Sequence, residues 1–169
     1  MLAPNHRPLT PLSFLERSAR VFPDKTAVVD HENRFTYREF LERARALAAG
    51  LQDAGIRRGD RVAFLAFNGE PLLTAHFGVP MGGGVLVPMN TRLSRREILY
   101  ILNHTEASIL IGSPSLLANL EDVRADCPGL RIPVLVAKGR EWNPHLERPS
   151  ASRDLRRRFP EEVWRYGLP

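Results

Sequence analysis

The sequence has little of what several kinds of functional site require. Cys127 is the only cysteine among 169 residues, so the chain can form neither an internal disulfide nor a cysteine-based metal site. Its apolar runs extend over only a few residues, whereas a membrane-spanning helix needs roughly 20. The first residues contain no apolar run of signal-peptide length. We therefore expect a soluble, cytoplasmic protein without a transmembrane segment.

Signatures of the common phosphate-binding loops are also absent. Neither G-x-x-x-x-G-K-[ST] nor G-x-G-x-x-G follows an expected strand. The sequence does contain three consecutive glycines, Gly82–Gly84, but they follow an expected helix and precede an expected strand. A phosphate loop has the opposite order, because the positive amino end of a helix must face the anion. We therefore interpret these glycines as a tight turn between a helix and a strand.

The chain is moderately basic, with 24 Lys or Arg against 19 Asp or Glu and a formal net charge of +5. The excess is concentrated in residues 138–169, where Pro, Ser and Arg dominate and no periodicity is sustained. This composition predicts one α/β domain over residues 1–137, followed by a basic, poorly ordered tail. The tail's run Arg156–Arg158 is a possible site for nucleic-acid phosphates. Because no base-reading element accompanies it, we expect no specific nucleic-acid partner.

Local patterns predict several helices. Three capping boxes indicate helix starts: Ser13 with Glu16, Thr36 with Glu39, and Ser94 with Glu97. The clearest helical periodicity covers Tyr37–Ala54, and Gly55 then supplies a left-handed stop. Further helices are expected near residues 70–79, 94–102 and 114–125.

Short apolar runs between these helices predict strands near residues 26–29, 61–66, 85–87, 108–111 and 133–136. The runs are almost continuously apolar, which is typical of strands buried on both faces. Strands that alternate with helices indicate βαβ units. The expected fold class is therefore α/β, with a mainly parallel sheet and helices on both of its faces.

Candidate site residues are few. Asn90 and Arg92 follow the strand that ends at Pro88, and ligands of open α/β sheets bind beyond the carboxyl ends of strands. We therefore take Asn90 and Arg92 as candidates for the edge of a substrate site.

Other chemically reactive side chains favour structural roles. His76 lies on an expected helix among apolar residues, and His31 and His104 have no partners at metal-ligand spacing. Asp24, Asp30 and Glu32 form a loose acidic group for which a solvated loop is the default interpretation. We expect no metal site.

Four segments closely resemble the N-terminal part of the acyl-CoA synthetases: Phe22–Val29, Phe35–Phe40, Gly55–Val62 and His76–Ser94. These enzymes belong to the adenylate-forming superfamily, together with firefly luciferase and the adenylation domains of peptide synthetases. The segments stand in the family's order and spacing, and the resemblance covers roughly residues 10–136.

The resemblance implies a two-step reaction that uses ATP, Mg²⁺ and coenzyme A. A carboxylic acid attacks the α-phosphate of ATP and releases pyrophosphate, and the thiol of coenzyme A then displaces AMP. In this family the phosphate loop is a Ser/Thr/Gly-rich run ending in Lys-Gly, and the 169 residues contain no such run.

No catalytic or cofactor-binding residue of the family therefore maps onto this chain. We expect an incomplete N-terminal subdomain that binds no cofactor and is inactive by itself. The alternative is a non-catalytic binding or regulatory half-domain that a partner chain completes.

Overall fold

A computed structural model describes residues 10–120, 123–131 and 135–136. These residues fall into two compact units, whose boundary lies between Glu42 and Arg43 within one helix. The predicted boundary at residue 138 and the predicted tail lie outside the described residues.

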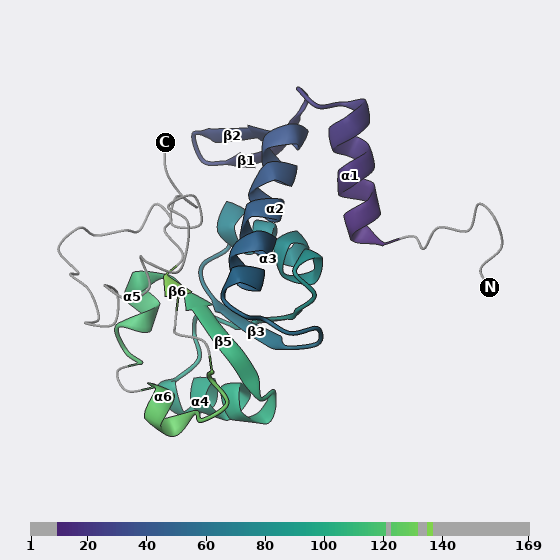
Figure 1. The fold of residues 1–169 in the computed structure, drawn as a ribbon. Coiled ribbons are helices and arrows are strands. Elements are labelled where there is room, and N and C mark those ends of the chain that lie inside the picture. Colours follow the sequence, from purple (N-terminus) through teal and green to yellow (C-terminus); the bar gives the residue numbers. More distant parts are fainter. Residues whose placement is uncertain (1–9, 121–122, 132–134, 137–169) are drawn as a thin grey trace, which may run out of the picture. The chain divides into compact units, whose positions relative to one another are not determined.

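The first unit contains a helix and a two-stranded hairpin. Helix α1 (Pro11–Val21) is followed by the antiparallel strands β1 (Thr26–Asp30) and β2 (Asn33–Thr36), and then by the start of α2 (Tyr37–Asp53) (Figure 1). We expected residues 26–29 to be one of the strands that alternate with helices. They pair instead with β2, a strand that we did not predict because polar Asn33 and Arg34 interrupt its apolar pattern.

The predicted helix starts are confirmed in two of three cases. The boxes Thr36/Glu39 and Ser94/Glu97 form, with the carboxylates accepting from the cap N–H at 2.7 and 2.8 Å. The prediction that Ser13 caps a helix is wrong. Helix α1 begins earlier, because Thr10 caps the helix and Ser13 occupies its third position.

The second unit is a doubly wound α/β fold. Its strands are β3 (Arg61–Leu65), β4 (Val85–Pro88), β5 (Ala107–Gly112) and β6 (Leu135–Val136), which form a parallel sheet in the order β4-β3-β5-β6. Helix α3 (Glu70–Met81) connects β3 to β4, and α4 (Arg95–His104) connects β4 to β5. The short helices α5 (Pro114–Leu117) and α6 (Val123–Asp126) follow β5.

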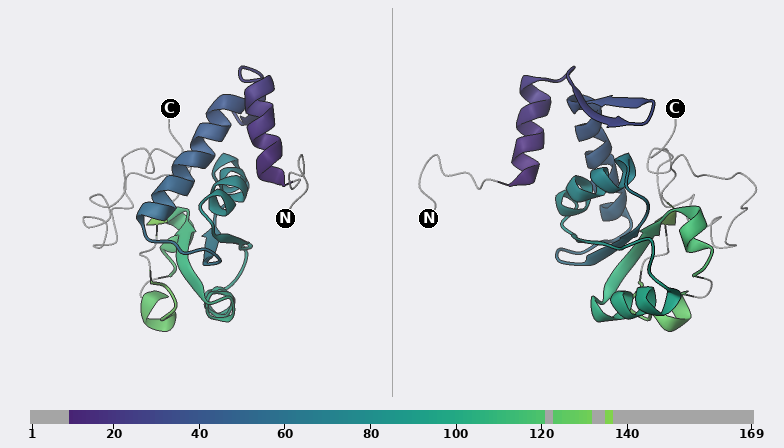
Figure 2. Two further views of the ribbon diagram at one scale, coloured as in Figure 1. Left: turned by 45° about the vertical axis from the view of Figure 1, so that its right-hand side comes forward. Right: turned by 180° about the vertical axis from the view of Figure 1, so that it is seen from behind.

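Each face of this sheet has its own buried core. On one face, α3 and the later part of α2 pack against β3 and β5 through Leu47, Leu51, Ala75, Val79, Val62, Phe64 and Ile109. On the other face, α4 and α6 pack through Ile98, Leu102, Val123, Cys127, Ala63, Leu65 and Leu110. Two further views show the helices of this unit on either side of the sheet (Figure 2). The predicted parallel sheet with helices on both faces is thus confirmed.

The segment after β5 differs from the single helix expected near residues 114–125. Helix α5 ends at Leu117, and the N–H of Leu120 then bonds to the Leu117 carbonyl oxygen at 2.9 Å in a turn. This turn leaves Leu120 only 4% exposed in the core that also contains Val123 of α6.

Candidate functional site

The carboxyl edge of the parallel sheet is the place where this topology is expected to bind a ligand. In the sheet register Phe64 pairs with Pro88, and Leu65 pairs with Gly112. The pairing continues one step further, because the Met89 N–H bonds to the Phe64 carbonyl oxygen at 2.9 Å. The ends of β4, β3 and β5 therefore stand side by side, and the segments that follow them share one edge.

The sheet also has a switch point between β3 and β5. After β3 the chain enters α3, which covers one face of the sheet. After β5 the chain enters α5 and α6, which cover the opposite face. The two following segments thus diverge at adjacent strand ends, and open α/β sheets bind ligands at such a point.

The structure places Asn90 and Arg92 at this edge, directly after β4. Both side chains are exposed, and the Asn90 Oδ1 accepts a hydrogen bond from the Arg92 backbone N–H at 2.9 Å. This local bond shapes the turn that leads to Ser94, the cap of α4. The Arg92 guanidinium makes no hydrogen bond or ion pair with any other residue in the part of the chain that the structure describes. It is therefore available to an anion.

Three further residues of this edge were missed in the sequence. Phe67 and Asn68 follow β3, and Ser113 follows β5. The Phe67 side chain is 45% exposed, unlike the apolar residues of β3 itself. The signal that selected Asn90, a polar residue just after an apolar run, was present for Asn68 and Ser113.

A buried ion pair supports the start of α3, immediately after Asn68. The Arg43 guanidinium donates to both carboxylate oxygens of Glu70, at 2.7 and 2.9 Å. The Thr74 hydroxyl donates to the same carboxylate at 2.5 Å. The Glu70 side chain is only 3% exposed. These contacts fix α3 to the second-unit part of α2, and they neutralise the Glu70 carboxylate close to the switch point.

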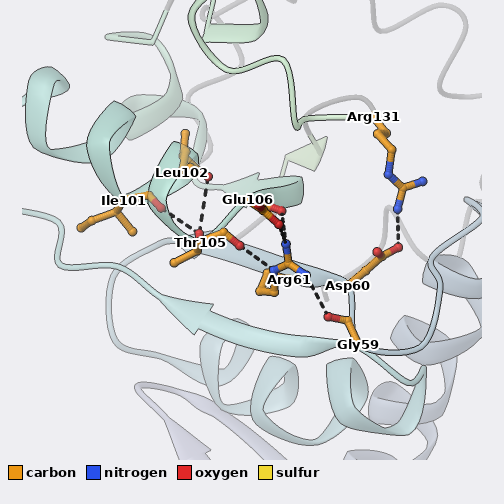
Figure 3. Close-up of polar contacts among 8 residues, drawn as sticks. All are labelled: Gly59, Asp60, Arg61, Ile101, Leu102, Thr105, Glu106 and Arg131. Carbon is orange, nitrogen blue, oxygen red and sulfur yellow. Dashed lines mark hydrogen bonds and ion pairs between the residues drawn. The ribbon is translucent and has the colours of Figure 1, made fainter.

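The amino edge of the same sheet, by contrast, is closed by bonds among its own residues (Figure 3). The Arg61 guanidinium donates to the Thr105 carbonyl oxygen at 2.5 Å and to the Glu106 carbonyl oxygen at 3.0 Å. It also pairs with the Glu106 carboxylate at 2.8 Å. Glu106 has a φ of 48°, a left-handed conformation that is strained for a residue with a Cβ. Arg61 thus holds the turn between α4 and β5.

The Asp60 carboxylate at this edge is also bonded to neighbouring residues. Its carboxylate accepts from the Arg57 backbone N–H at 2.7 Å and pairs with the Arg131 guanidinium. Burial alone would raise the pKa of Asp60. These two contacts, together with a hydrogen bond from Ser108, outweigh the burial and hold that pKa below its usual 3.8. We assign the amino edge a structural role.

The glycine turn also belongs to the amino edge, as predicted for a tight connection between helix and strand. Gly83 has a φ of 93°, and its carbonyl oxygen accepts from the Gly59 N–H at 2.8 Å. A Cβ on Gly84 would lie 2.8 Å from the Ile56 side chain and 3.3 Å from the Asp60 carbonyl oxygen. Close backbone packing therefore explains Gly83 and Gly84, and the glycines lie at the edge opposite the candidate site.

The histidines that we discounted have local contacts. The His76 Nδ1 lies 2.8 Å from the Leu72 carbonyl oxygen of its own helix. His31 forms part of the hairpin turn, with a φ of 55°. His104 stacks on Tyr100, with ring centroids 5.5 Å apart.

Within the described residues, no group of three or more His, Cys, Asp or Glu is arranged to hold a metal ion. Over the same residues, no helix is both long and apolar enough to cross a membrane. The single cysteine, Cys127, is buried. Burial raises the pKa of its thiol above the usual 9.0, and the nearby Asp126 carboxylate adds to this effect.

Comparison with known proteins identifies relatives over most of the chain. The AMP-binding enzyme family matches residues 15–163. The 4-hydroxybutyrate–CoA ligase 2 of Metallosphaera sedula is 42% identical over 116 residues, which are 69% of this chain and 21% of the relative. The long-chain-fatty-acid–CoA ligase of Thermus thermophilus is 45% identical over 117 residues, covering 67% of this chain and 22% of the relative.

Solved structures give the same result. The anthranilate CoA ligase AuaEII in complex with anthranoyl-AMP matches with a TM-score of 0.70 and 30% identity, covering 74% of this chain and 24% of that chain. The Klebsiella oxytoca NpsA N-terminal subdomain matches with a TM-score of 0.61 and 28% identity, covering 75% of this chain and 29% of that chain. The chain thus spans about a fifth of the length of the curated relatives it matches.

Proposed function

The chain belongs to the AMP-binding enzyme family, and on that premise we propose that it forms the N-terminal α/β part of an acyl-CoA ligase. The reaction converts a carboxylic acid, ATP and coenzyme A into acyl-CoA, AMP and pyrophosphate. The observation that carries this proposal is the match to CoA ligases in both sequence and fold, at 42% identity and a TM-score of 0.70.

Within that reaction we assign this chain a supporting role. The described residues offer no acidic cluster for Mg²⁺, and the glycine turn follows a helix where a phosphate loop would precede one. We therefore assign the described residues no role in binding ATP phosphates or Mg²⁺. We propose that the 169-residue chain has no ligase activity by itself and that further residues supply the catalytic groups.

Asn90 and Arg92 are the residues of this chain that we assign to the edge of the substrate site. The carboxylic acid, ATP and coenzyme A all carry negative charge, and the Arg92 guanidinium is an exposed cation without a partner among the described residues. An arginine can bind a carboxylate or phosphate with two parallel hydrogen bonds. Asn90 contributes by holding the turn that presents Arg92.

A second candidate function is a non-catalytic module that a partner chain completes. The observation that favours it is strand β4, which lies at one edge of the sheet as the described residues form it and in which Val85 is 49% exposed, whereas β3 and β5 are almost entirely buried. An edge strand presents unpaired backbone N–H and C=O groups, with which a strand of another chain can pair. A strand or loop of a partner chain that packs along β4 would cover Val85 and pair with this edge.

Complementation in trans tests both candidates. The chain is produced alone, and also together with a Thermus thermophilus long-chain-fatty-acid–CoA ligase that lacks its matching segment. We expect no acyl-CoA from the chain alone, and acyl-CoA from the pair. Arg92→Ala should lower the activity of the pair, whereas the exposed Arg45→Ala should not.

The outcomes separate the candidates. Activity of the chain alone would overturn the supporting role that we assign to it. Co-purification of the pair without acyl-CoA formation would favour the non-catalytic module. Absence of both association and activity would count against both candidates.

The same proposal includes a cytoplasmic location, with which the low cysteine content of the chain is compatible. It includes no specific nucleic-acid partner. Recovery of a tagged chain from an oxidising compartment, or tight binding to one DNA sequence, would contradict these two statements.

A further inference from the structure

Helix α4 carries a row of exposed side chains that the candidate substrate site does not use. Ile98 and Leu102 of this helix are buried in the core against the sheet. Arg96, Tyr100 and His104 follow one another at four-residue spacing, so they lie along a different face of the same helix. All three are exposed. We call these three residues the α4 ridge.

Two rings of the α4 ridge hold each other in place. The Tyr100 and His104 rings are stacked, with centroids 5.5 Å apart and planes 9° from parallel. Although this stack covers one face of its ring, Tyr100 is 66% exposed, more than any other large hydrophobic residue in the described ranges. A tyrosine presents a large contact surface with only two side-chain torsions, so a partner that packs on it loses little of its binding energy to ordering.

Other polar residues of α4 are bonded to α6, whereas the α4 ridge is not. The Arg95 guanidinium donates to the Asp126 carboxylate at 2.7 Å, and the Asn103 amide donates to the Asp126 carbonyl oxygen at 3.0 Å. The Arg96 guanidinium forms no hydrogen bond or ion pair with another residue of the described segments. The ridge therefore combines an open aromatic face with an unpaired positive charge one helical turn away.

The charge around the α4 ridge is positive. The one acidic residue of α4 is Glu97, and its carboxylate accepts from the Ser94 N–H at 2.8 Å and from the Ser94 hydroxyl at 2.7 Å. Arg92 and Arg96 are exposed and have no partner among the described residues. Because partners meet with complementary charge, this surface fits an acidic partner.

The direction of the ridge separates it from the candidate substrate site. Helix α4 begins at the carboxyl edge of the sheet, just after β4, and ends at the amino edge, where Glu106 leads into β5. The rings of Tyr100 and His104 therefore lie in the later half of the helix, toward the edge that is closed by its own contacts. We place the further residues of the ligase at the opposite, carboxyl edge.

Two other occupants match the ridge less well. A second copy of this chain would bring the arginines of two ridges together, and like charges in contact oppose association. Single-stranded nucleic acid is bound in a groove whose several cations follow the phosphate backbone. The ridge itself contributes the single guanidinium of Arg96. These observations favour a protein segment that carries one carboxylate and one ring.

We propose that the α4 ridge docks an acidic, aromatic segment of a separate protein. A carboxylate of that segment accepts two parallel hydrogen bonds from the Arg96 guanidinium, and its ring packs on the open face of Tyr100. One helical turn, about 5.4 Å, separates the two residues along the axis. Alternate side chains of an extended segment are about 6.6 Å apart, so a carboxylate two residues from the ring matches this spacing.

Nuclear magnetic resonance titration of the isotope-labelled 169-residue chain tests the ridge with a defined probe. The probe is the peptide acetyl-Glu-Gly-Trp-Gly-Glu-amide, and two matched peptides carry Lys in place of both Glu, or Ala in place of Trp. The probe should shift the backbone amide signals of Arg96, Tyr100 and His104 with a dissociation constant of about 1 mM. The Lys peptide should not shift them, and the Ala peptide should bind at least about threefold more weakly.

Matched variants of the chain assign the two contacts. Tyr100→Ala and Arg96→Gln should each weaken binding of the probe about three- to ten-fold. Phe14→Ala removes an exposed ring from α1, and Arg45→Gln removes an exposed guanidinium from α2. Neither of these two controls should change the affinity, and circular dichroism should show that all four variants keep the parent fold.

A thiol label distinguishes a separate partner from the rest of the ligase. The Tyr100→Cys variant should react with iodoacetamide at the same rate alone and in the pair with the shortened Thermus thermophilus ligase. Cys127 is buried, and the parent chain corrects for its reaction. Slower labelling in the pair would show that the ligase itself covers the ridge, which would overturn the proposal.

The proposal is also overturned if the Lys peptide shifts the same signals, or if Tyr100→Ala binds the probe like the parent chain. Shifts of the ridge signals with chain concentration alone would identify a second copy as the occupant, and tighter binding of oligothymidylate than of the probe would identify nucleic acid. The proposal does not depend on ligase activity. Complementation without probe binding would remove the ridge and keep the proposed function, and the reverse result would do the opposite.

Discussion

Replacement of Glu70 by glutamine should destabilise the second unit more than any exposed charge replacement would. The Glu70 side chain is 3% exposed and that of Arg43 is 19% exposed, so water reaches this pair only from the arginine side. Glutamine keeps an acceptor for Thr74 but removes the charge with which the largely buried Arg43 guanidinium pairs. Removal of one partner of a buried pair costs about 3 kcal/mol.

That loss is measurable by thermal and urea unfolding of the 169-residue chain, followed by circular dichroism. A loss of about 3 kcal/mol should lower the midpoint temperature by on the order of 10 °C. The matched control is Glu42→Gln, which removes an exposed carboxylate from the preceding helix position and should change stability by less than about 0.5 kcal/mol.

A double-mutant cycle distinguishes loss of the Arg43–Glu70 pair from a general effect of substitution at the start of α3. Arg43→Met combined with Glu70→Gln removes the buried charge altogether, so the double variant should be destabilised by at least about 1 kcal/mol less than the sum of the single variants. Additive effects, or a Glu70→Gln loss no larger than that of Glu42→Gln, would refute the idea that this pair fixes α3 to α2.

Three further predictions follow from the described contacts. Gly78→Ala should destabilise the chain by about 1–3 kcal/mol in urea unfolding, because its Cβ would lie 2.8 Å from the Ala44 carbonyl oxygen; an unchanged midpoint would contradict this packing. Asp60→Asn should lower stability at pH 7 but much less at pH 3. The folded-state pKa of Asp60 is depressed, so its contribution is present above the unfolded pKa and is lost as pH falls through the folded pKa; equal losses at both pH values would contradict it. The Cys127 thiol should react with a thiol reagent only as fast as the chain opens, because it is buried and its pKa is raised; rapid labelling of the native chain would show that it is accessible.

The parallel sheet could be predicted because each of its longer strands is a continuous apolar run between helical segments. The same rule failed for β1, since the apolar run at residues 26–29 does not distinguish a parallel strand from one arm of a hairpin. The pairing partner is set by contacts with β2, whose Asn33 and Arg34 give no apolar signal. Capping boxes were reliable where the carboxylate reaches the cap N–H, and they failed at Ser13, where an earlier threonine competes for the same role.

The candidate site could be predicted only in part, for a topological reason. Asn90 and Arg92 follow a strand that is evident in the sequence. The importance of Asn68 and Ser113 depends on the strand order β4-β3-β5, which brings their strand ends together. That strand order arises from crossover connections on opposite faces of the sheet. The hydrophobic periodicity of the sequence does not indicate on which face a connection lies. The Arg43–Glu70 pair was missed for the same reason, because its partners lie on different helices.

The most direct test of the account is a chimera. Residues 10–131 of this chain replace the matching segment of the Thermus thermophilus long-chain-fatty-acid–CoA ligase, and acyl-CoA formation is measured with the purified protein. If this chain forms the N-terminal α/β part of such a ligase, the chimera should fold and synthesise acyl-CoA, and Arg92→Ala should reduce its rate. A folded, stable chimera that forms no acyl-CoA would contradict the account.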